Sequence, residues 1–146
     1  WHLVQENQVG TYTETVEEIE SCGFTRASAV YASNVPDDVP YSHNMEWLVS
    51  EANAAVDSAL NSSKPFFVSV WPTITHSPDV FESLFNYSIN ATPSGNLSIA
   101  PNTTMPDRAS VWSRAEEAAS GNRVDRTAAA IWLDDGVGAI RDHLEM

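Results

Sequence analysis

Hydrophobic and polar positions alternate with helical spacing at several places along the chain. Residues 11–21 place Val16 and Ile19 among acidic neighbours, which predicts a short helix ending near Gly23. A longer helix is predicted over residues 44–60, with Asn44 as its N-cap. The apolar face of this second helix would be formed by Met45, Leu48, Ala52, Ala55 and Ala59.

Two further helices are predicted near the end of the sequence. An Ala-rich stretch over residues 110–120 precedes Gly121, which favours a helix that stops there. Residues 124–145 have the clearest helical periodicity, with apolar residues at spacings of four, three and four. These apolar positions are Leu133, Val137, Ile140 and Leu144.

Two segments have the composition of strands. Residues 24–33 mix Thr, Ala, Val and Tyr, and residues 66–71 form a continuous apolar and β-branched run between prolines. The second pattern is typical of a strand that is buried on both faces of a parallel sheet. Residues 72–78 would then lie at the carboxyl end of that strand, where open α/β sheets bind ligands.

The order of helix, buried strand and helix predicts an α/β layered domain. A length of 146 residues suits one domain with a hydrophobic core. Residues 79–123 are predicted to form an irregular insertion or an exposed excursion, because most of this stretch is polar and rich in Ser, Thr and Pro.

The charge of the chain argues against several classes of partner. Twenty acidic and seven basic residues give a formal net charge of −13, and no basic patch is present to bind nucleic acid or anionic lipid. The content of 42% hydrophobic and 18% charged residues is that of a globular protein. No apolar run approaches the roughly 20 residues of a membrane helix, so no membrane span is expected.

Five sequons of the form Asn-x-Ser/Thr point to a cellular compartment. Their acceptor residues are Asn61, Asn86, Asn90, Asn96 and Asn102. Attached glycans require an exposed segment, which fits the predicted excursion. We therefore expect a eukaryotic secretory protein, extracellular or lysosomal; the alternative is that sequons arise by chance in loops rich in Asn, Ser and Thr.

Several segments, in order, resemble the N-terminal catalytic domain of the sulfatase family, within the alkaline phosphatase-like superfamily. Trp1-His2-Leu3 resembles the end of the family's Gly-Lys-Trp-His-Leu-Gly motif. Cys22-Gly23-Phe24 resembles its Gly-Phe-Asp segment, with Thr25 in place of the usual Asp.

The resemblance continues through the second half of the chain. His43-Asn-Met-Glu-Trp47 resembles the segment before the family's central strand. Lys64-Pro-Phe-Phe67, followed by His76-Ser-Pro78, resembles its Lys-Pro-Phe-Phe strand and His-x-Pro-type loop. Residues 131–138, running on to Glu145, resemble the helix before its Asp-Asn or Asp-His metal motif.

This resemblance implies a fold and an activity. The fold would be part of a three-layer α/β/α domain with a largely parallel sheet, and the chain an interior fragment of it. The activity would be hydrolysis of sulfate esters of a small molecule or carbohydrate by a formylglycine nucleophile and a calcium ion. Both groups would lie outside this chain, so the fragment alone is expected to be inactive. Cys22 lacks the Pro and Arg of the family's Cys-x-Pro-x-Arg motif and is not expected to be the nucleophile.

Two histidines match positions that act in the family. His76 corresponds to the His that contacts the sulfate and helps protonate the leaving oxygen, and an imidazole suits both tasks near neutral pH. His2 corresponds to the His that bonds the hydrated formylglycine. The alternatives are a loop histidine that caps backbone groups for His76 and a terminal histidine without a role for His2.

Other polar residues have simpler explanations. Cys22 is the only cysteine, so it forms no internal disulfide, and we expect a buried thiol. Lys64 is predicted to be a solvated flank of the strand. Asp134 and Asp135 point about 100° apart on a helix, so we expect surface or polar packing contacts rather than a shared site.

Two alternative functions remain open at this point. The first is a phosphatase, phosphodiesterase or phosphonate hydrolase of the same superfamily, with related chemistry on a different ester. The second is a secreted acidic glycoprotein that has a sulfatase-like scaffold but only a binding function.

Overall fold

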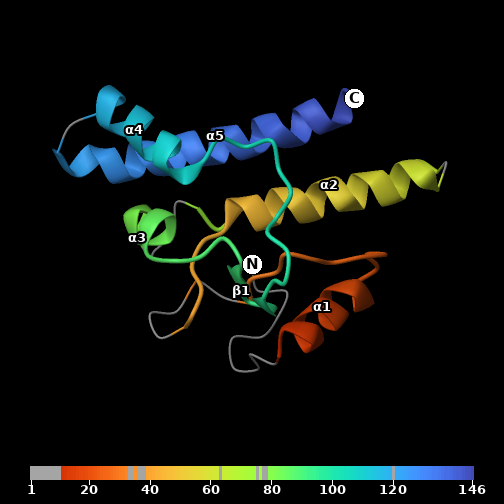
Figure 1. Cartoon of the computed structure of the whole chain (residues 1–146). Coiled ribbons are helices and arrows are strands. Elements are labelled where there is room, and N and C mark those ends of the chain that lie inside the picture. The colour runs from red at the N-terminus through yellow and green to blue at the C-terminus, as the bar shows by residue number, and fades with distance from the viewer. Residues whose placement is uncertain are drawn as a thin grey trace.

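The computed structural model describes residues 11–32, 35, 39–62, 64–74, 76, 79–119 and 121–146 (Figure 1). Of these described residues, 54% are in helices and 3% in strands. The helices are α1 (Tyr12–Ser21), α2 (Met45–Asn61), α3 (Val80–Phe85), α4 (Arg108–Ala118) and α5 (Val124–Leu144). The other elements are a 3-10 helix (Gly121–Arg123) and the strands β1 (Ala91–Thr92) and β2 (Gly95–Asn96). None of the described helices combines the length and hydropathy of a membrane span.

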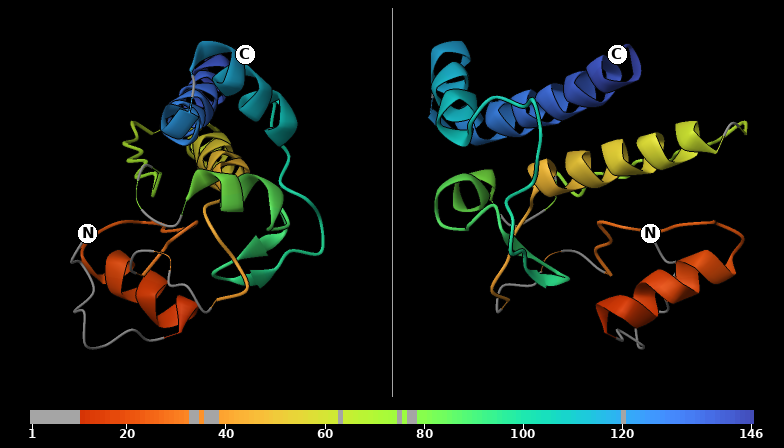
Figure 2. Two further views of the ribbon diagram at one scale, coloured as in Figure 1. Left: turned by 90° about the vertical axis from the view of Figure 1, so that its left-hand side faces the viewer. Right: turned by 45° about the vertical axis from the view of Figure 1, so that its right-hand side comes forward.

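The longest helices, α2 and α5, pack against each other and form the centre of the molecule. Helix α4 packs against α5, and α3 contacts both α4 and α5 (Figure 2). Helix α1 lies on the other side of α2, where the rings of Tyr12 and Trp47 are 6.0 Å apart (Figure 1). The core is therefore built between helices, with Trp132 of α5 and Val49 of α2 fully buried in it.

The predicted α/β/α domain with a parallel sheet is wrong for the described residues. Their one sheet is the antiparallel hairpin of β1 and β2, in which Ala91 pairs with Asn96 and Thr92 with Gly95. Neither residues 24–32 nor residues 66–71 form a strand. Strand propensity reflects packing on a pleated surface, and the described residues offer these two segments no neighbouring strand.

The apolar run of residues 66–71 lies on the surface instead of in the core. Phe67 is 81% exposed and Trp71 is 63% exposed. The chain enters the core only at Ile74, which is buried with residues of α2 and α5. An apolar composition alone therefore did not predict burial at this position.

The predicted helices at both ends and in the middle of the chain are confirmed. The Thr11 side chain caps α1 and forms a reciprocal capping box with Glu14, and Gly23 follows the helix at φ +106°. The Asn44 side chain caps α2, as predicted, by accepting a hydrogen bond from the amide of Trp47 at 2.9 Å. Helices α4 and α5 lie within a few residues of their predicted positions.

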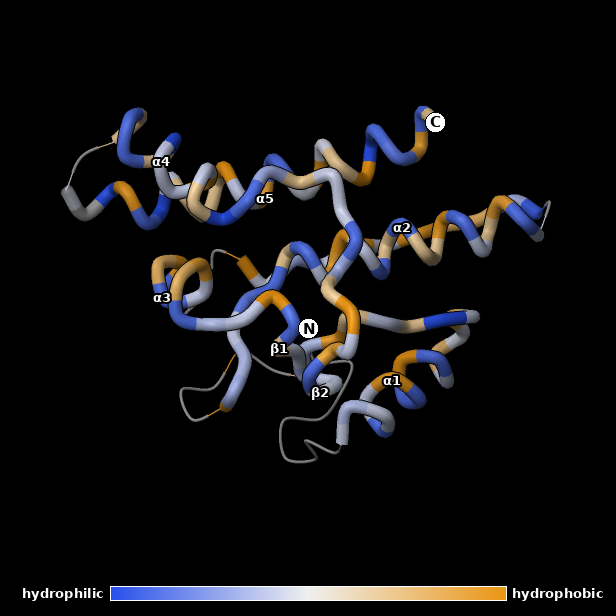
Figure 3. The backbone as a smooth tube through the Cα atoms, viewed as in Figure 1, coloured by the Kyte–Doolittle hydropathy of each residue, from blue (hydrophilic) through white to orange (hydrophobic). Residues whose placement is uncertain are grey.

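Only half of the predicted apolar stripe of α5 reaches the core, since Leu133 and Ile140 are partly buried and pack against it. Val137 and Leu144 of that stripe are 57% and 52% exposed (Figure 3 shows hydropathy along the chain). The buried residues are mostly small: Ala128, Ala129, Trp132, Gly136 and Ala139. A Cβ at Gly136 would clash with the end of the Met45 side chain and lie 3.3 Å from Val49 Cγ2, so small residues allow α2 to approach closely.

Residues 79–123 contain more regular structure than the predicted irregular excursion. Helix α3 begins after its N-cap Asp79 and buries Val80 and Leu84. Helix α4 buries Val111 and Ala115 against the same core. The six residues of α3 are too few to show helical periodicity in the sequence, so only the cap could have indicated it.

Arg108, the first residue of α4, joins four elements through one guanidinium group. It forms a two-pronged ion pair with Glu46 of α2, with both N–O distances 3.0 Å. It also donates to the carbonyl oxygens of Ser83 at 2.7 Å and Tyr87 at 2.9 Å, and its guanidinium carbon lies 5.2 Å from the centre of the Trp132 ring. Both charged side chains are only 10% exposed.

We expect Arg108→Met to lower the free energy of unfolding by about 3–5 kcal/mol, because it leaves the buried Glu46 carboxylate without its partner. Urea unfolding followed by circular dichroism measures this change. Arg141→Met is the matched control, since the pair of Arg141 with Asp142 is exposed and should contribute little. Equal effects of the two substitutions would show that the buried pair does not hold the helices together.

Candidate functional site

The segment Ser42–Asn44, just before α2, is buried although it is entirely polar. Ser42, His43 and Asn44 are each at most 3% exposed. The Ser42 hydroxyl lies 2.7 Å from the hydroxyl of Ser83 in α3, and the Asn44 amide donates to the carbonyl of Ile89 at 2.7 Å. The segment therefore ties α2 to α3 and to the loop before β1.

His43 connects this segment to the turn that contains His76. Its Nε2 lies 2.9 Å from the carbonyl oxygen of His76, and its Nδ1 lies 2.8 Å from the hydroxyl of Thr73. A carbonyl oxygen only accepts, so Nε2 carries the hydrogen in this bond, and in the neutral ring Nδ1 accepts from Thr73. The amide of His76 also donates to the carbonyl of Thr73 at 3.1 Å, which closes the turn.

The His76 side chain, our candidate sulfate contact, is exposed at this turn. Its backbone is held by His43 and by the neighbouring Ile74, which is 7% exposed and packs in the core. An accessible imidazole on an anchored backbone can donate a hydrogen bond to an anion or transfer a proton.

The other predicted catalytic residue, His2, lies outside the described residues. The described residues contain no group of three His, Cys, Asp or Glu side chains that could hold a metal ion. The calcium ion implied by the sulfatase resemblance therefore has no fitting ligand set among the described residues.

Two carboxylates meet where the His76 turn leads into α3. The amide of Phe81 donates to Asp79 Oδ1 at 2.7 Å and to Asp125 Oδ1 at 3.0 Å, so both carboxylates share one donor. Burial raises the pKa of Asp125, and the adjacent Asp79 raises it further. The raised pKa shows that the charged form of Asp125 is disfavoured at the junction between α3 and α5.

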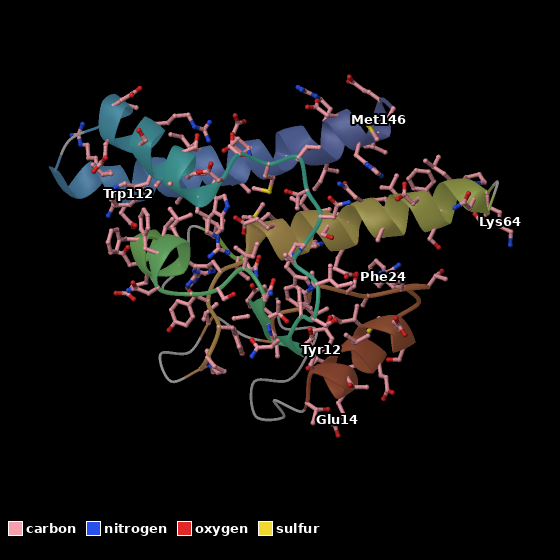
Figure 4. All side chains as sticks on the ribbon, viewed as in Figure 1. Tyr12, Glu14, Phe24, Lys64, Trp112 and Met146 are labelled. Carbon is pink, nitrogen blue, oxygen red and sulfur yellow. The ribbon has the colours of Figure 1, made fainter. Side chains whose placement is uncertain are left out.

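The remaining sequence candidates have structural roles or lie on the surface. Lys64 is exposed, as predicted, near the far end of α2 (Figure 4). Asp134 is exposed and Asp135 forms an ion pair with Arg114 of α4, as expected of surface and packing contacts. The prediction of a buried thiol is wrong, because Cys22 follows α1 as its C-cap and is exposed.

The acceptor residues of the sequons differ in accessibility. Asn61, Asn86, Asn96 and Asn102 are exposed. Asn90 is partly buried, its side-chain oxygen is fully buried, and Thr92 of the same sequon is 3% exposed with its hydroxyl bonded to Gly95. In this fold, four of the five positions therefore present an accessible side chain for a glycan.

His43 is the residue of this site whose role the sequence left undefined. It lies directly before the N-cap Asn44, yet its ring bonds residues about thirty positions away. Such a partner is invisible to local patterns. The one available signal was its place within the segment that resembles the sulfatase family.

Searches of protein-family models, of curated proteins and of solved structures find no significant match to this chain. The sulfatase resemblance therefore rests on the motifs themselves.

We expect His43→Leu to lower the free energy of unfolding by about 1–3 kcal/mol, because the Thr73 hydroxyl and the His76 carbonyl lose a partner in a partly buried turn. Amide hydrogen exchange at His76 should accelerate in the same variant. Thr73→Val, which removes one of the two bonds, should cost less, about 0.5–1.5 kcal/mol. Unchanged exchange at His76 in the His43 variant would contradict this positioning role.

We expect Asp125→Asn to raise stability at neutral pH. A folded pKa above the unfolded value means that the stabilising contribution of Asp125 is present when it is protonated and is lost as the pH rises through its folded pKa. Asn is neutral at every pH and keeps an oxygen for the amide of Phe81. The advantage of the variant should therefore shrink towards about pH 3, where Asp125 is protonated.

The control for this prediction is Asp134→Asn in the same helix, which removes an equal charge at an exposed position. Thermal unfolding of both variants between acidic and neutral pH measures the difference. An equal gain from both substitutions would mean that the overall negative charge, rather than the Asp79–Asp125 pair, destabilises the fold.

Proposed function

We propose that this chain forms part of a sulfuric ester hydrolase, in which His76 contacts the sulfate group and protonates the leaving oxygen. The observation that carries the proposal is the order of the sulfatase-like segments, which extend from Trp1 to Glu145. In this proposal His2 bonds the formylglycine nucleophile, and both that nucleophile and the calcium ligands lie outside the sequence. The substrate is a sulfated small molecule or carbohydrate.

The surroundings of His76 support the acid role that we assign to it. Proton transfer to a leaving oxygen requires a ring that can reach the substrate, and the His76 side chain is exposed. The reaction also needs a fixed position for the ring, and the bond from His43 holds the His76 backbone. The proposal does not include the three-layer fold, since the described residues are arranged as packed helices.

A second candidate is a secreted glycoprotein that binds its ligand without chemical turnover. The exposed acceptor residues Asn61, Asn86, Asn96 and Asn102 favour a glycoprotein in either case. A superfamily phosphatase or phosphodiesterase is the third possibility, because an imidazole can also act as the general acid in the cleavage of a phosphate ester. The three functions differ in the anion bound and in whether His76 affects turnover.

The proposal predicts that sulfate binds at His76 in the isolated chain. Titration with sodium sulfate at constant ionic strength should shift the NMR signals of the His76 ring in a saturable way. The isolated chain should not hydrolyse a fluorogenic sulfate ester. In a longer protein that includes the proposed nucleophile, His76→Gln should lower kcat by about 10²–10⁴-fold, the usual contribution of a general acid.

His143→Gln is the matched control, because His143 belongs to α5, outside the sulfatase-like loop, and is engaged with Asp57 on α2. It should leave both the sulfate shift and kcat unchanged. If sulfate shifted the NMR signals of His143 as much as those of His76, the result would contradict a specific anion-binding role for His76. Faster hydrolysis of a phosphate ester than of the sulfate ester would favour the phosphatase alternative instead.

A further inference from the structure

Four large apolar side chains are exposed within the six residues 66–71. Phe67 is 81% exposed and Trp71 is 63% exposed, and Phe66 and Val70 are exposed as well. Single exposed apolar residues are common on protein surfaces, but a contiguous run of them marks a contact with another molecule. Figure 2 (left) shows this part of the chain, in yellow-green, at the side of the molecule next to α2.

The backbone of the same run is open to pairing. Residues 65–73 follow one another without a helix, a turn or a bend. The backbone amides and carbonyls of residues 66–70 make no hydrogen bond to any other described residue. An unpaired backbone with apolar side chains is a template for a β-strand of another chain.

Charge decides which chain can supply that strand. The protein has a net charge of −13, yet residues 65–73 contain no charged residue. Two copies can therefore bring these runs together without placing like charges across the contact. The rest of their surfaces repel each other, and this repulsion is screened by salt.

The order of residues in the run matches a second copy of itself. When two antiparallel strands are related by a two-fold axis, one residue lies opposite its own counterpart. With Ser69 at this position, Phe67 of each copy lies opposite Trp71 of the other. On the other face of the strands, Val68 lies opposite Val70. Aromatic and β-branched pairs of this kind stabilise neighbouring strands.

We propose that residues 66–71 pair with the same residues of a second copy, as two antiparallel strands centred on Ser69. The four exposed side chains contribute about 400–500 Å² per copy, given their exposed fractions and the size of aromatic side chains. With the backbones of both copies, the buried area approaches about 1,200 Å², the lower end of specific interfaces. The dimer should therefore dissociate on dilution. This inference is independent of the sulfatase proposal, since it uses neither sulfate nor the His76 side chain.

The first test measures association by sedimentation velocity from about 5 to 500 μM, where an interface of this size dissociates. Raising NaCl from about 20 to 300 mM should strengthen the dimer, because salt screens the repulsion between the acidic copies. Phe67→Ser should weaken the dimer at least about 10-fold. Ile99→Ser is the matched control, because Ile99 is equally exposed, at 82%, and lies outside the run.

Ser69→Pro separates strand pairing from a general apolar contact. It removes a backbone donor at the centre of the proposed strand pair but no apolar surface, so it should also weaken the dimer. The amide of Ser69 has no partner within the described chain, so the fold does not depend on it. Circular dichroism of the monomer should therefore be unchanged.

The second test locates the centre of the contact by cross-linking, in a Cys22→Ala background that removes the exposed native thiol. Opposite residues of antiparallel strands have Cα atoms about 4.5–5.5 Å apart, within the reach of a disulfide. Ser69→Cys should therefore form a disulfide-linked dimer on oxidation. The control is Lys64→Cys, whose two copies would lie about 33 Å apart along the paired strands.

The proposal is overturned if the chain stays monomeric over this concentration range, or if Ser69→Cys cross-links no faster than Lys64→Cys. It is also overturned if Phe67→Ser and Ile99→Ser weaken association equally, or if Ser69→Pro associates as well as the unaltered chain. The last two results would show apolar contact without pairing of these strands.

Discussion

The buried ion pair between Arg108 and Glu46 is the constraint on which the arrangement of helices depends. It joins the first turn of α4 to the first turn of α2, and the remaining Arg108 donors satisfy carbonyls at the end of α3 and beyond it. Removing either charge would leave the other in a site that is only 10% exposed, where an unpaired charge is costly. The Arg108 guanidinium carbon also lies 5.2 Å from the centre of the Trp132 ring, so α5 contacts the same pair.

The sequence predicted helices that are defined by residues close together in the chain. It did not predict contacts between residues that are far apart in the chain. The N-cap Asn44 and the Gly that follows α1 act within a few residues, so α1 and α2 could be located from the pattern alone. The run at residues 66–71 has the composition of a buried strand, but burial depends on neighbours that the described residues do not provide. Arg108 and Glu46 are 62 positions apart, and no local pattern pairs them.

The candidate site shows the same division. His76 could be singled out from its segment, whereas the residue that holds its backbone, His43, became evident only from the fold. The small residues on the buried face of α5 were also missed, because periodicity of large apolar residues pointed to the face with Val137. Close approach of α2 and α5 at Gly136 favours small residues over large ones.

A double-mutant cycle on Glu46 and Arg108 tests the central claim most directly. Free energies of unfolding would be measured for Glu46→Leu, Arg108→Met, the double variant and the unaltered chain. The account predicts that the double variant loses less free energy of unfolding than the two single variants lose together. The difference, which is the coupling energy, should be about 1–3 kcal/mol. Additive losses, with no coupling energy, would contradict the claim that this ion pair holds the helices in place.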